Sequence, residues 1–252
     1  MIEATITQDE KEVLKYVRQF AQKEVKPLAR EIDRTKSVPQ KIIDRMNELG
    51  LFSSYIPREY GGAGLSFSFL VRVIEELSMA CPSTALVLDG ALTLFADPLI
   101  MFGSDDLKKR YLTKVAAGAV GGLALTEANA GSDAAAIKTS AVRKGNGYVI
   151  NGSKMFISNG RIAKFFVVDA VTDPSKGHRG ITTFVVDADS PGFRVSRDIE
   201  KLGIRGSSTV ELEFQDVFVY FNNHPAGNAP RNAMDFAAIM GTESGGHQMQ
   251  LF

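Results

Sequence analysis

The sequence lacks the features that mark nucleic-acid-binding, secreted and membrane-spanning proteins. Its 29 basic residues equal its 29 acidic residues, so no excess charge would attract a nucleic acid or an acidic membrane surface. The amino terminus is acidic and polar, whereas a secretory signal begins with a basic segment and an apolar run. No stretch approaches the roughly 18 apolar residues of a membrane span. We therefore expect a cytoplasmic protein with no membrane span and no nucleic-acid partner.

The sequence is also poor in residues that bind metals or form disulfides. Cys81 is the only cysteine, and its apolar surroundings in residues 77–83 indicate a small buried hydrophobic side chain rather than a reactive thiol. The three histidines, His178, His224 and His247, lie in polar, loop-like contexts without metal-ligand spacing. No glycine-rich motif of a nucleotide-binding βαβ unit occurs. We expect no metal site and no doubly wound nucleotide fold.

The first half of the chain carries a helical pattern. Apolar residues recur at helical spacing, and Thr7 with Glu10 predicts a capping box at the start of the first helix. Pro39 near the start and Gly50 at the end frame a second helix. Further helices are expected over residues 67–79, 84–102 and 105–117. The pattern predicts an all-helical domain over residues 1–118.

From about residue 119 the apolar period changes to two, which is typical of strands. The clearest alternation places Val210, Leu212 and Phe214 on one face of a strand and polar residues on the other, so this strand should cover a core on one side. Helices precede strands without βαβ alternation, which predicts an α+β fold with an antiparallel β-barrel or sandwich over residues 119–220. Residues 221–252 are expected to form an irregular tail, with coil composition over 221–232 and a stretch at 234–240 that could start a further helix.

One hairpin is expected within the β domain. Asn151-Gly152 is the dipeptide that best supplies the positive φ angles of a two-residue hairpin turn. It lies between two strand-like stretches, residues 148–150 and 154–157.

Two segments resemble the signatures of the acyl-CoA dehydrogenase family. In residues 124–133, ALTEANAGSD, Thr-Glu is followed after three residues by Gly-Ser-Asp, as in the first signature of that family. Residues 151–160, NGSKMFISNG, resemble its second flavin segment, NGxKxWITNG. Further matches lie at residues 49–51 with 57–62, 201–205 and 214–217. The resemblance implies the amino-terminal helical domain and the middle β domain of that family.

The resemblance also implies a set of FAD-binding residues. They are Leu123, Leu125, Thr126, Gly131, Ser132, Phe156, Ile157 and Ser158. A flavin that accepts a hydride needs hydrogen-bond donors near N1, O2 and N5, because negative charge develops there. Leu125 and Thr126 would donate at the pyrimidine side, and Ser132 would lie near both FAD and the acyl-CoA. Phe156 and Ser158 occupy positions where the family usually has Trp and Thr.

Without the resemblance, the same residues have ordinary structural explanations. Thr126-Glu127 and residues 131–133 have the chemistry of turns and caps, in which Asp and Ser bind local amides. Phe156 alone is more typical of a core aromatic, and Asn159-Gly160 of a plain turn. The occurrence of both segments in order and at the family's spacing favours the flavin site.

The implied reaction is α,β-dehydrogenation of an acyl-CoA, with electrons passed to an electron-transfer flavoprotein. A carboxylate must remove the α-proton. In most of the family this base is a glutamate in a carboxy-terminal helical domain that this chain does not contain. Glu243 is the candidate within the chain, although the family position aligns near Gly246, and a solvated carboxylate in a frayed tail is the alternative.

The missing helical domain leaves several interpretations open. The chain would expose apolar surface where that domain docks. It could be a truncated product, a protein that needs a second polypeptide to supply the helical domain, or a non-catalytic acyl-CoA-binding or protein-binding module. A homo-oligomer or a complementing helical subunit is expected. Flavin monooxygenases and acyl-CoA oxidases share the architecture, so the electron acceptor stays open.

Overall fold

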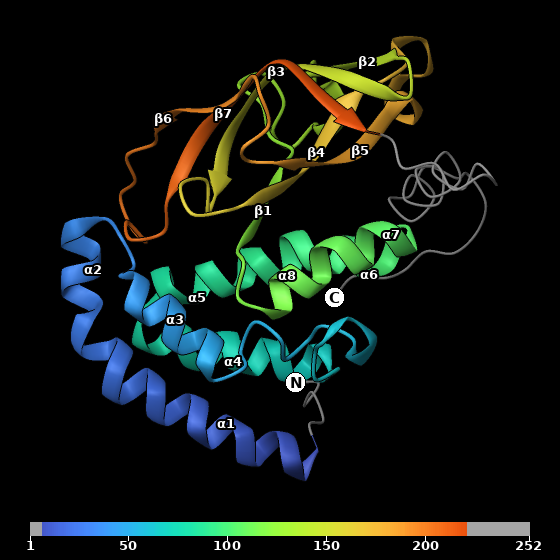
Figure 1. The fold of residues 1–252 in the computed structure, drawn as a ribbon. Coiled ribbons are helices and arrows are strands. Elements are labelled where there is room, and N and C mark those ends of the chain that lie inside the picture. The colour runs from blue at the N-terminus through green and yellow to red at the C-terminus, as the bar shows by residue number, and fades with distance from the viewer. Residues whose placement is uncertain (1–6, 221–252) are drawn as a thin grey trace.

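The computed structural model describes residues 7–220, and Figure 1 shows a helical layer beneath a curled sheet. The α-helices are α1 (Gln8–Phe20), α2 (Ala29–Thr35), α3 (Gln40–Glu48), α4 (Phe67–Ala80), α5 (Pro82–Asp89), α6 (Asp97–Phe102), α7 (Asp105–Leu107) and α8 (Thr113–Ala116). Three π-helical segments, Ala21–Val25, Gly90–Ala96 and Lys108–Leu112, continue or join them. Short 3-10 turns occur at Lys26–Leu28, Arg58–Tyr60, Ala134–Ala136 and Pro174–Gly180.

The helix signals in the sequence correspond to real caps. The Thr7 backbone N–H donates to Glu10 Oε2 at 2.7 Å, and the Glu10 N–H donates to Thr7 Oγ1 at 3.2 Å, so the capping box that starts α1 is confirmed. Pro39 directly precedes α3 and accepts the Ile42 N–H through its carbonyl oxygen at 2.9 Å, and Gly50 follows that helix with φ 70°. Ser104 caps α7 by accepting the Leu107 N–H at 3.3 Å.

Seven strands form one curled sheet in the described residues. They are β1 (Gly121–Ala124), β2 (Ser140–Lys144), β3 (Gly147–Ser158), β4 (Phe165–Val171), β5 (Ile181–Asp187), β6 (Phe193–Asp198) and β7 (Thr209–Tyr220). Their order is β1-β4-β2-β3-β7-β6, and β5 pairs with β4. The predicted order of helices before strands is confirmed. The sheet is mixed, because β1 and β2 both pair with β4 in parallel while the remaining pairs are antiparallel.

The hairpin predicted at Asn151-Gly152 is wrong. Residues 147–158 form one continuous strand, β3, and the turn lies earlier, between β2 and β3. The Asn151 side chain is bound to a partner 65 residues away: its Nδ2 donates to Asp216 Oδ1 at 3.1 Å, and its Oδ1 accepts the Asp216 N–H at 2.9 Å. Gly152 has φ 149° and lies against Thr139. Gly152 therefore allows Thr139 to approach the backbone of β3 closely, at a register shift between β3 and β7, and it does not form a turn.

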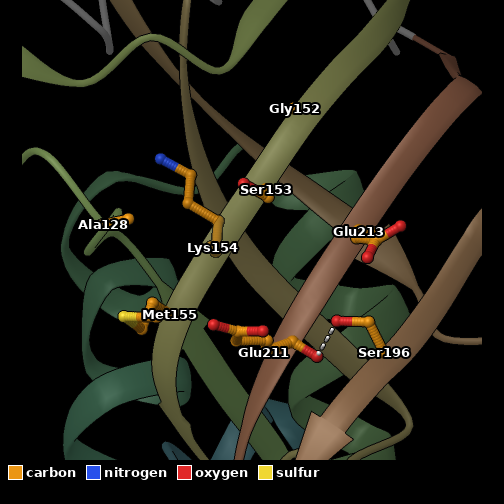
Figure 2. Close-up of a pocket in the computed structure, with 8 residues that line it drawn as sticks. All are labelled: Ala128, Gly152, Ser153, Lys154, Met155, Ser196, Glu211 and Glu213. Carbon is orange, nitrogen blue, oxygen red and sulfur yellow. Dashed lines mark hydrogen bonds between the residues drawn. The ribbon is translucent and has the colours of Figure 1, made fainter.

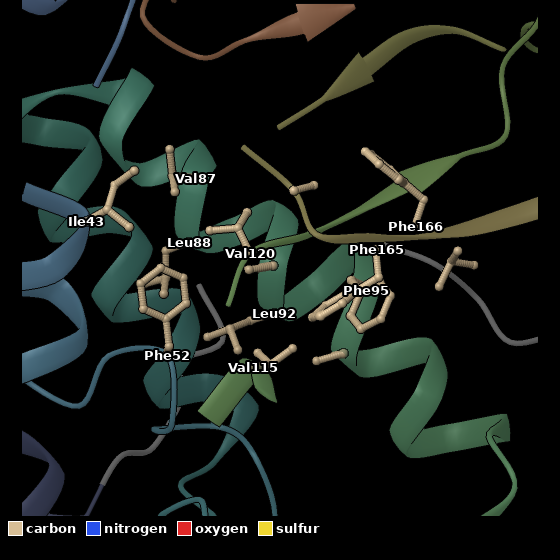
Figure 3. Packing of buried hydrophobic residues seen from close by; sticks show 14 of the residues in the cluster. Ile43, Phe52, Val87, Leu88, Leu92, Phe95, Val115, Val120, Phe165 and Phe166 are labelled. Carbon is tan, nitrogen blue, oxygen red and sulfur yellow. The ribbon is translucent and has the colours of Figure 1, made fainter. Parts of the chain in front are cut away.

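One hydrophobic core joins the helices to the sheet (Figure 3). At its centre the Phe95 ring packs against Phe165 of β4, with 4.5 Å between the ring centroids. Tyr111 completes the group, 5.3 Å from Phe165 and 6.1 Å from Phe95. Gly121 of β1 lies against the Phe95 ring where no side chain would fit. The predicted inward face of β7 is confirmed, since Val210, Leu212 and Phe214 are all buried.

The continuous helix Pro82–Phe102 corrects one expectation from the sequence. It is long and apolar enough, by length and composition, to cross a membrane, which we had not expected of any segment. About half of its apolar window is buried inside the described structure, where Leu88, Leu92 and Phe95 belong to the core. A core helix between other helices and a sheet has this composition for the same physical reason as a membrane span. Cys81, just before it, is buried as predicted.

Several sequence predictions fall on residues that the structure does not describe. These are the irregular tail 221–252, the candidate base Glu243 and the two histidines His224 and His247. His178 lies in an exposed 3-10 turn between β4 and β5, as its polar surroundings predict.

Candidate functional site

The two signature segments lie side by side. The Thr126 carbonyl oxygen accepts a hydrogen bond from the Met155 N–H at 2.7 Å. The Leu125 carbonyl oxygen accepts one from Lys154 Nζ at 2.9 Å. Residues about thirty positions apart in the sequence are thus joined directly, where the loop after β1 meets the middle of β3. The two segments are therefore close enough to contribute residues to one binding site.

A buried ion pair lies beneath this contact. Lys154 Nζ and Glu127 Oε1 are 2.9 Å apart, and both side chains are almost fully buried. Burial lowers the pKa of Lys154 below its usual value, although Glu127 opposes that shift. Burial by itself would raise the pKa of Glu127. Hydrogen bonds from Thr139, Lys138 and Lys154 outweigh it and hold the pKa below its usual value.

A β-bulge in β3 turns one aromatic ring outward. Lys154 pairs with Leu212 and Ile157 with Val210, so two residues, Met155 and Phe156, stand opposite one residue of β7. Phe156 has φ 60°, a conformation that a bulky residue rarely adopts, and its side chain is 58% exposed. The core interpretation of Phe156 is therefore wrong, since the bulge presents its ring to the surface beside the loop after β1.

The other predicted site residues occupy different depths. Ile157 is buried and faces the core, whereas Ser158, next along β3, is half-buried. Leu123 is half-buried in β1 and pairs with Val167. Gly131 and Ser132 lie in an exposed turn. A β-bridge between Glu127 and Ala130 closes the loop just before this turn. The structure joins Leu125 and Thr126 to β3 by hydrogen bonds, and it leaves Gly131 and Ser132 further along the same loop.

A shallow pocket of about 380 Å³ opens beside the contact between the two segments (Figure 2). Its lining residues are Ala128, Gly152, Ser153, Lys154, Met155, Ser196, Glu211 and Glu213. The two carboxylates are paired, Glu211 with Arg197 and Glu213 with Arg194. Sequence reasoning did not single out these acids or Lys154. The available signal for Lys154 was its place in the second flavin segment, where NGxKxWITNG carries a lysine.

The arrangement can bind a planar, polar ring. The Thr126 N–H and the hydroxyls of Thr126, Ser132 and Ser158 have no hydrogen-bond partner among residues 7–220. The exposed Phe156 ring provides an aromatic surface nearby. A Cβ at Gly131 would have no neighbour within 4 Å, so the loop leaves open space there. Free donors next to an exposed aromatic ring fit the needs of an isoalloxazine.

Comparisons with known proteins point to one family. The family profile for the acyl-CoA dehydrogenase N-terminal domain matches residues 7–119, and that for the middle domain matches residues 122–217. The chain is 41% identical over 219 residues to the short-chain-specific acyl-CoA dehydrogenase of Clostridium acetobutylicum, an alignment that covers 86% of this chain and 58% of that protein.

Solved structures agree in fold. A chain in a structure of the electron transferring flavoprotein of Acidaminococcus fermentans matches with a TM-score of 0.85 and 38% identity, over 92% of this chain and 62% of that one. An acyl-CoA dehydrogenase complexed with FAD from Bacillus anthracis matches with a TM-score of 0.79 and 30% identity, over 87% of this chain and 37% of that one. This chain thus spans less than two thirds of the length of each of these proteins.

Proposed function

The chain belongs to the acyl-CoA dehydrogenase family, and from that premise we propose that it supplies the FAD-binding face of an enzyme that oxidises acyl-CoA thioesters. The observation that carries the proposal is the direct contact between the two signature segments, through the Thr126 carbonyl oxygen and the Met155 N–H. The free donors and the exposed aromatic ring around that contact support it.

FAD, when bound, supplies the acceptor for a hydride. In this proposal Leu125 and Thr126 hold the pyrimidine side of the flavin through backbone and hydroxyl donors. Phe156 lies against the flavin face, and Ser158 offers its hydroxyl and amide near N5. The remaining contacts to the cofactor come from Leu123, Gly131, Ser132 and Ile157. Ile157 acts through its backbone, because its side chain faces the core.

The proposed substrate is an acyl-CoA thioester. Ser132 lies in an exposed turn and would contact both the cofactor and the acyl-CoA. A carboxylate removes the α-proton while the β-hydrogen leaves with its electron pair, so that a carbon–carbon double bond forms. The base in this proposal is a glutamate that lies outside the described residues or belongs to a second polypeptide. Glu243 is a candidate outside the described range. Electrons would pass to an electron-transfer flavoprotein, and the working form would be an oligomer in the cytoplasm.

The test is FAD binding by the 252-residue chain. We expect quenched flavin fluorescence and a shifted visible band on addition of FAD. Phe156→Ala should weaken the binding of FAD, because it removes the exposed aromatic surface that the flavin face would cover. Val142→Ala is the matched control, since Val142 is a similarly exposed apolar residue, at 65%, on β2. A wild-type chain that leaves the spectrum of FAD unchanged would remove the proposal.

Two further outcomes distinguish related functions. Binding of an acyl-CoA without bleaching of the flavin band, even when a complementing helical subunit that carries the glutamate is present, would indicate a non-catalytic acyl-CoA-binding module. Oxygen consumption with an acyl-CoA, in place of reduction of an electron-transfer flavoprotein, would indicate an oxidase.

A further inference from the structure

Lys154 is a charged residue in a place where an apolar one would ordinarily lie. It is 1% exposed and is among the largest fully buried side chains of the described residues. Taking an ammonium group out of water costs several kcal/mol even when the charge is paired. A methionine would fill a similar volume without that cost. The hydrogen bonds that the Lys154 ammonium group makes should therefore explain why a lysine occupies this position.

The ammonium group holds two points of the loop after β1. Lys154 Nζ donates to the Leu125 carbonyl oxygen and to Glu127 Oε1, both at 2.9 Å. In Figure 2 its side chain extends from β3 toward the segment that carries Ala128. One side chain thus ties the start of the loop to the strand.

Glu127 extends this connection to the end of the loop. Its Oε2 accepts the Lys138 N–H at 2.7 Å, and its Oε1 accepts the Thr139 N–H at 2.9 Å. The loop between residues 127 and 139 is therefore closed on a buried carboxylate whose charge Lys154 balances. On β4, the buried Asp169 also interacts with the Lys154 charge.

The hydrogen bond from Lys154 to the Leu125 carbonyl also fixes the direction of the Thr126 N–H. In a trans peptide the carbonyl of one residue and the N–H of the next point in opposite directions. The Leu125 carbonyl faces Lys154, so the Thr126 N–H faces away from it. That N–H has no acceptor among the described residues, while the next carbonyl, of Thr126, is bound to the Met155 N–H. The peptide between Leu125 and Thr126 thus presents a free donor on the side away from the buried ion pair.

We propose that Lys154 is a positioning residue, which fixes the Leu125 carbonyl so that the Thr126 N–H is aimed at a polar edge of the bound cofactor. This inference rests on the proposed FAD site. It adds a role for a residue that does not itself touch the cofactor.

A double variant separates positioning from simple stability. Lys154→Met alone leaves the Glu127 charge buried and unpaired, which should destabilise the fold strongly and lower the midpoint of urea unfolding. Lys154→Met combined with Glu127→Gln removes both charges, and we expect part of the stability to return, because a glutamine amide can still accept one of the two backbone N–H groups that Glu127 accepts. The Leu125 carbonyl still lacks its donor in that variant. We expect FAD to bind it about tenfold more weakly, which corresponds to about 1.4 kcal/mol.

The matched control is Lys201→Met. Lys201 is half-buried, whereas Lys154 is fully buried, but its Nζ likewise donates to a backbone carbonyl oxygen, that of Ser207 at 2.6 Å. Lys201 does not line the pocket beside the two segments. It should alter stability without altering the dissociation constant for FAD, measured by flavin fluorescence.

Hydrogen exchange of the chain without FAD gives a reading that does not depend on the proposed function. The Met155 amide is protected by the Thr126 carbonyl and the Ala130 amide by the Glu127 carbonyl. We expect both to exchange faster in the double variant than in the wild type. Unchanged protection would overturn the inference, and so would wild-type FAD affinity in a folded double variant. Failure of the wild-type chain to bind FAD, with faster exchange in the variant, would count against the proposed function alone.

Discussion

The side chain of Asn159, at the end of β3, donates a hydrogen bond from Nδ2 to the Val87 carbonyl oxygen of α5, at 3.1 Å. The same amide reaches the Gly121 carbonyl oxygen at 3.4 Å, so one residue links a helix and two strands. The π-helical segment Gly90–Ala96 begins directly after this point, as expected where a side chain enters the hydrogen-bond ladder of a helix. A Cβ at Gly90 would lie 2.5 Å from Asn159 Nδ2.

Asn159 should be sensitive to substitution for two separable reasons. Asn159→Ala removes a fully buried amide and keeps a φ of 61° that alanine disfavours, so we expect a loss of about 2 to 3 kcal/mol. Asn159→Gly removes the same hydrogen bonds but accepts the backbone angle, and it should be about 1 kcal/mol less damaging. Urea unfolding of both variants measures the difference. Equal losses would mean that the backbone angle is not strained.

Phe156 should show a conflict between stability and binding. Its φ of 60° costs about 1 to 3 kcal/mol for a non-glycine residue, and its ring is largely exposed. Phe156→Gly should therefore raise the midpoint of thermal unfolding while weakening FAD binding. Val142→Gly, on an ordinary exposed strand position, should lower the midpoint and leave FAD binding unchanged. A lower midpoint for Phe156→Gly would contradict the strain that we infer.

Gly152 should not tolerate a side chain. An added Cβ would lie 2.5 Å from Thr139 Oγ1 and 2.7 Å from Thr139 Cα, at a φ of 149°. Gly152→Ala should destabilise the protein by about 1 to 3 kcal/mol, because the neighbouring backbone must shift. Gly203→Ala is the control, since an added Cβ there has no neighbour within 4 Å. Chemical denaturation compares the two variants, and equal midpoints would refute the close approach.

Asp169 should make stability depend on pH in the unusual direction. Burial raises its pKa above the ordinary 3.8, although Thr183 and Lys154 oppose the shift. A carboxyl with a raised folded-state pKa stabilises the fold fully below its unfolded pKa, and this contribution is lost as pH rises through the folded pKa. Asp169→Asn should therefore gain stability relative to the wild type as the pH rises above the ordinary pKa of an aspartate. Unfolding free energies measured over a series of pH values above that point test the sign.

Asp198 provides a control for the direction of the pH dependence. The Arg161 guanidinium beside it lowers the pKa of Asp198 below its ordinary value. Its contribution is therefore present above the unfolded pKa and is lost as pH falls through the folded one. Asp198→Asn should show the opposite trend from Asp169→Asn, and parallel trends would show that the pH dependence arises elsewhere.

Local sequence chemistry predicted the helices well, because their signals are local. Thr7 and Glu10 are three residues apart, and the capping box they form needs nothing from the rest of the chain. The Asn151-Gly152 turn failed for the opposite reason. Its local preference is real, but Asp216, far along the sequence, holds Asn151 within a strand.

The contact between the two signature segments was predictable from the sequence, whereas the buried groups that support it were not. The resemblance brought together the loop after β1 and the middle of β3, and the structure has these segments in contact. Nothing in the pattern indicated that Lys154 is buried, because the burial of a charge depends on partners such as Glu127 and Asp169 that only the fold supplies.

The shared aromatic group has a practical consequence for anyone dividing this chain. Phe95 and Tyr111 come from the helices and Phe165 from the sheet, and all three bury their rings against one another. If the chain is cut after Gly118, where the composition changes, each fragment exposes to water the apolar surface that it buries in the intact structure. Neither half would be an autonomous folding unit, and recombinant fragments made at that position should aggregate.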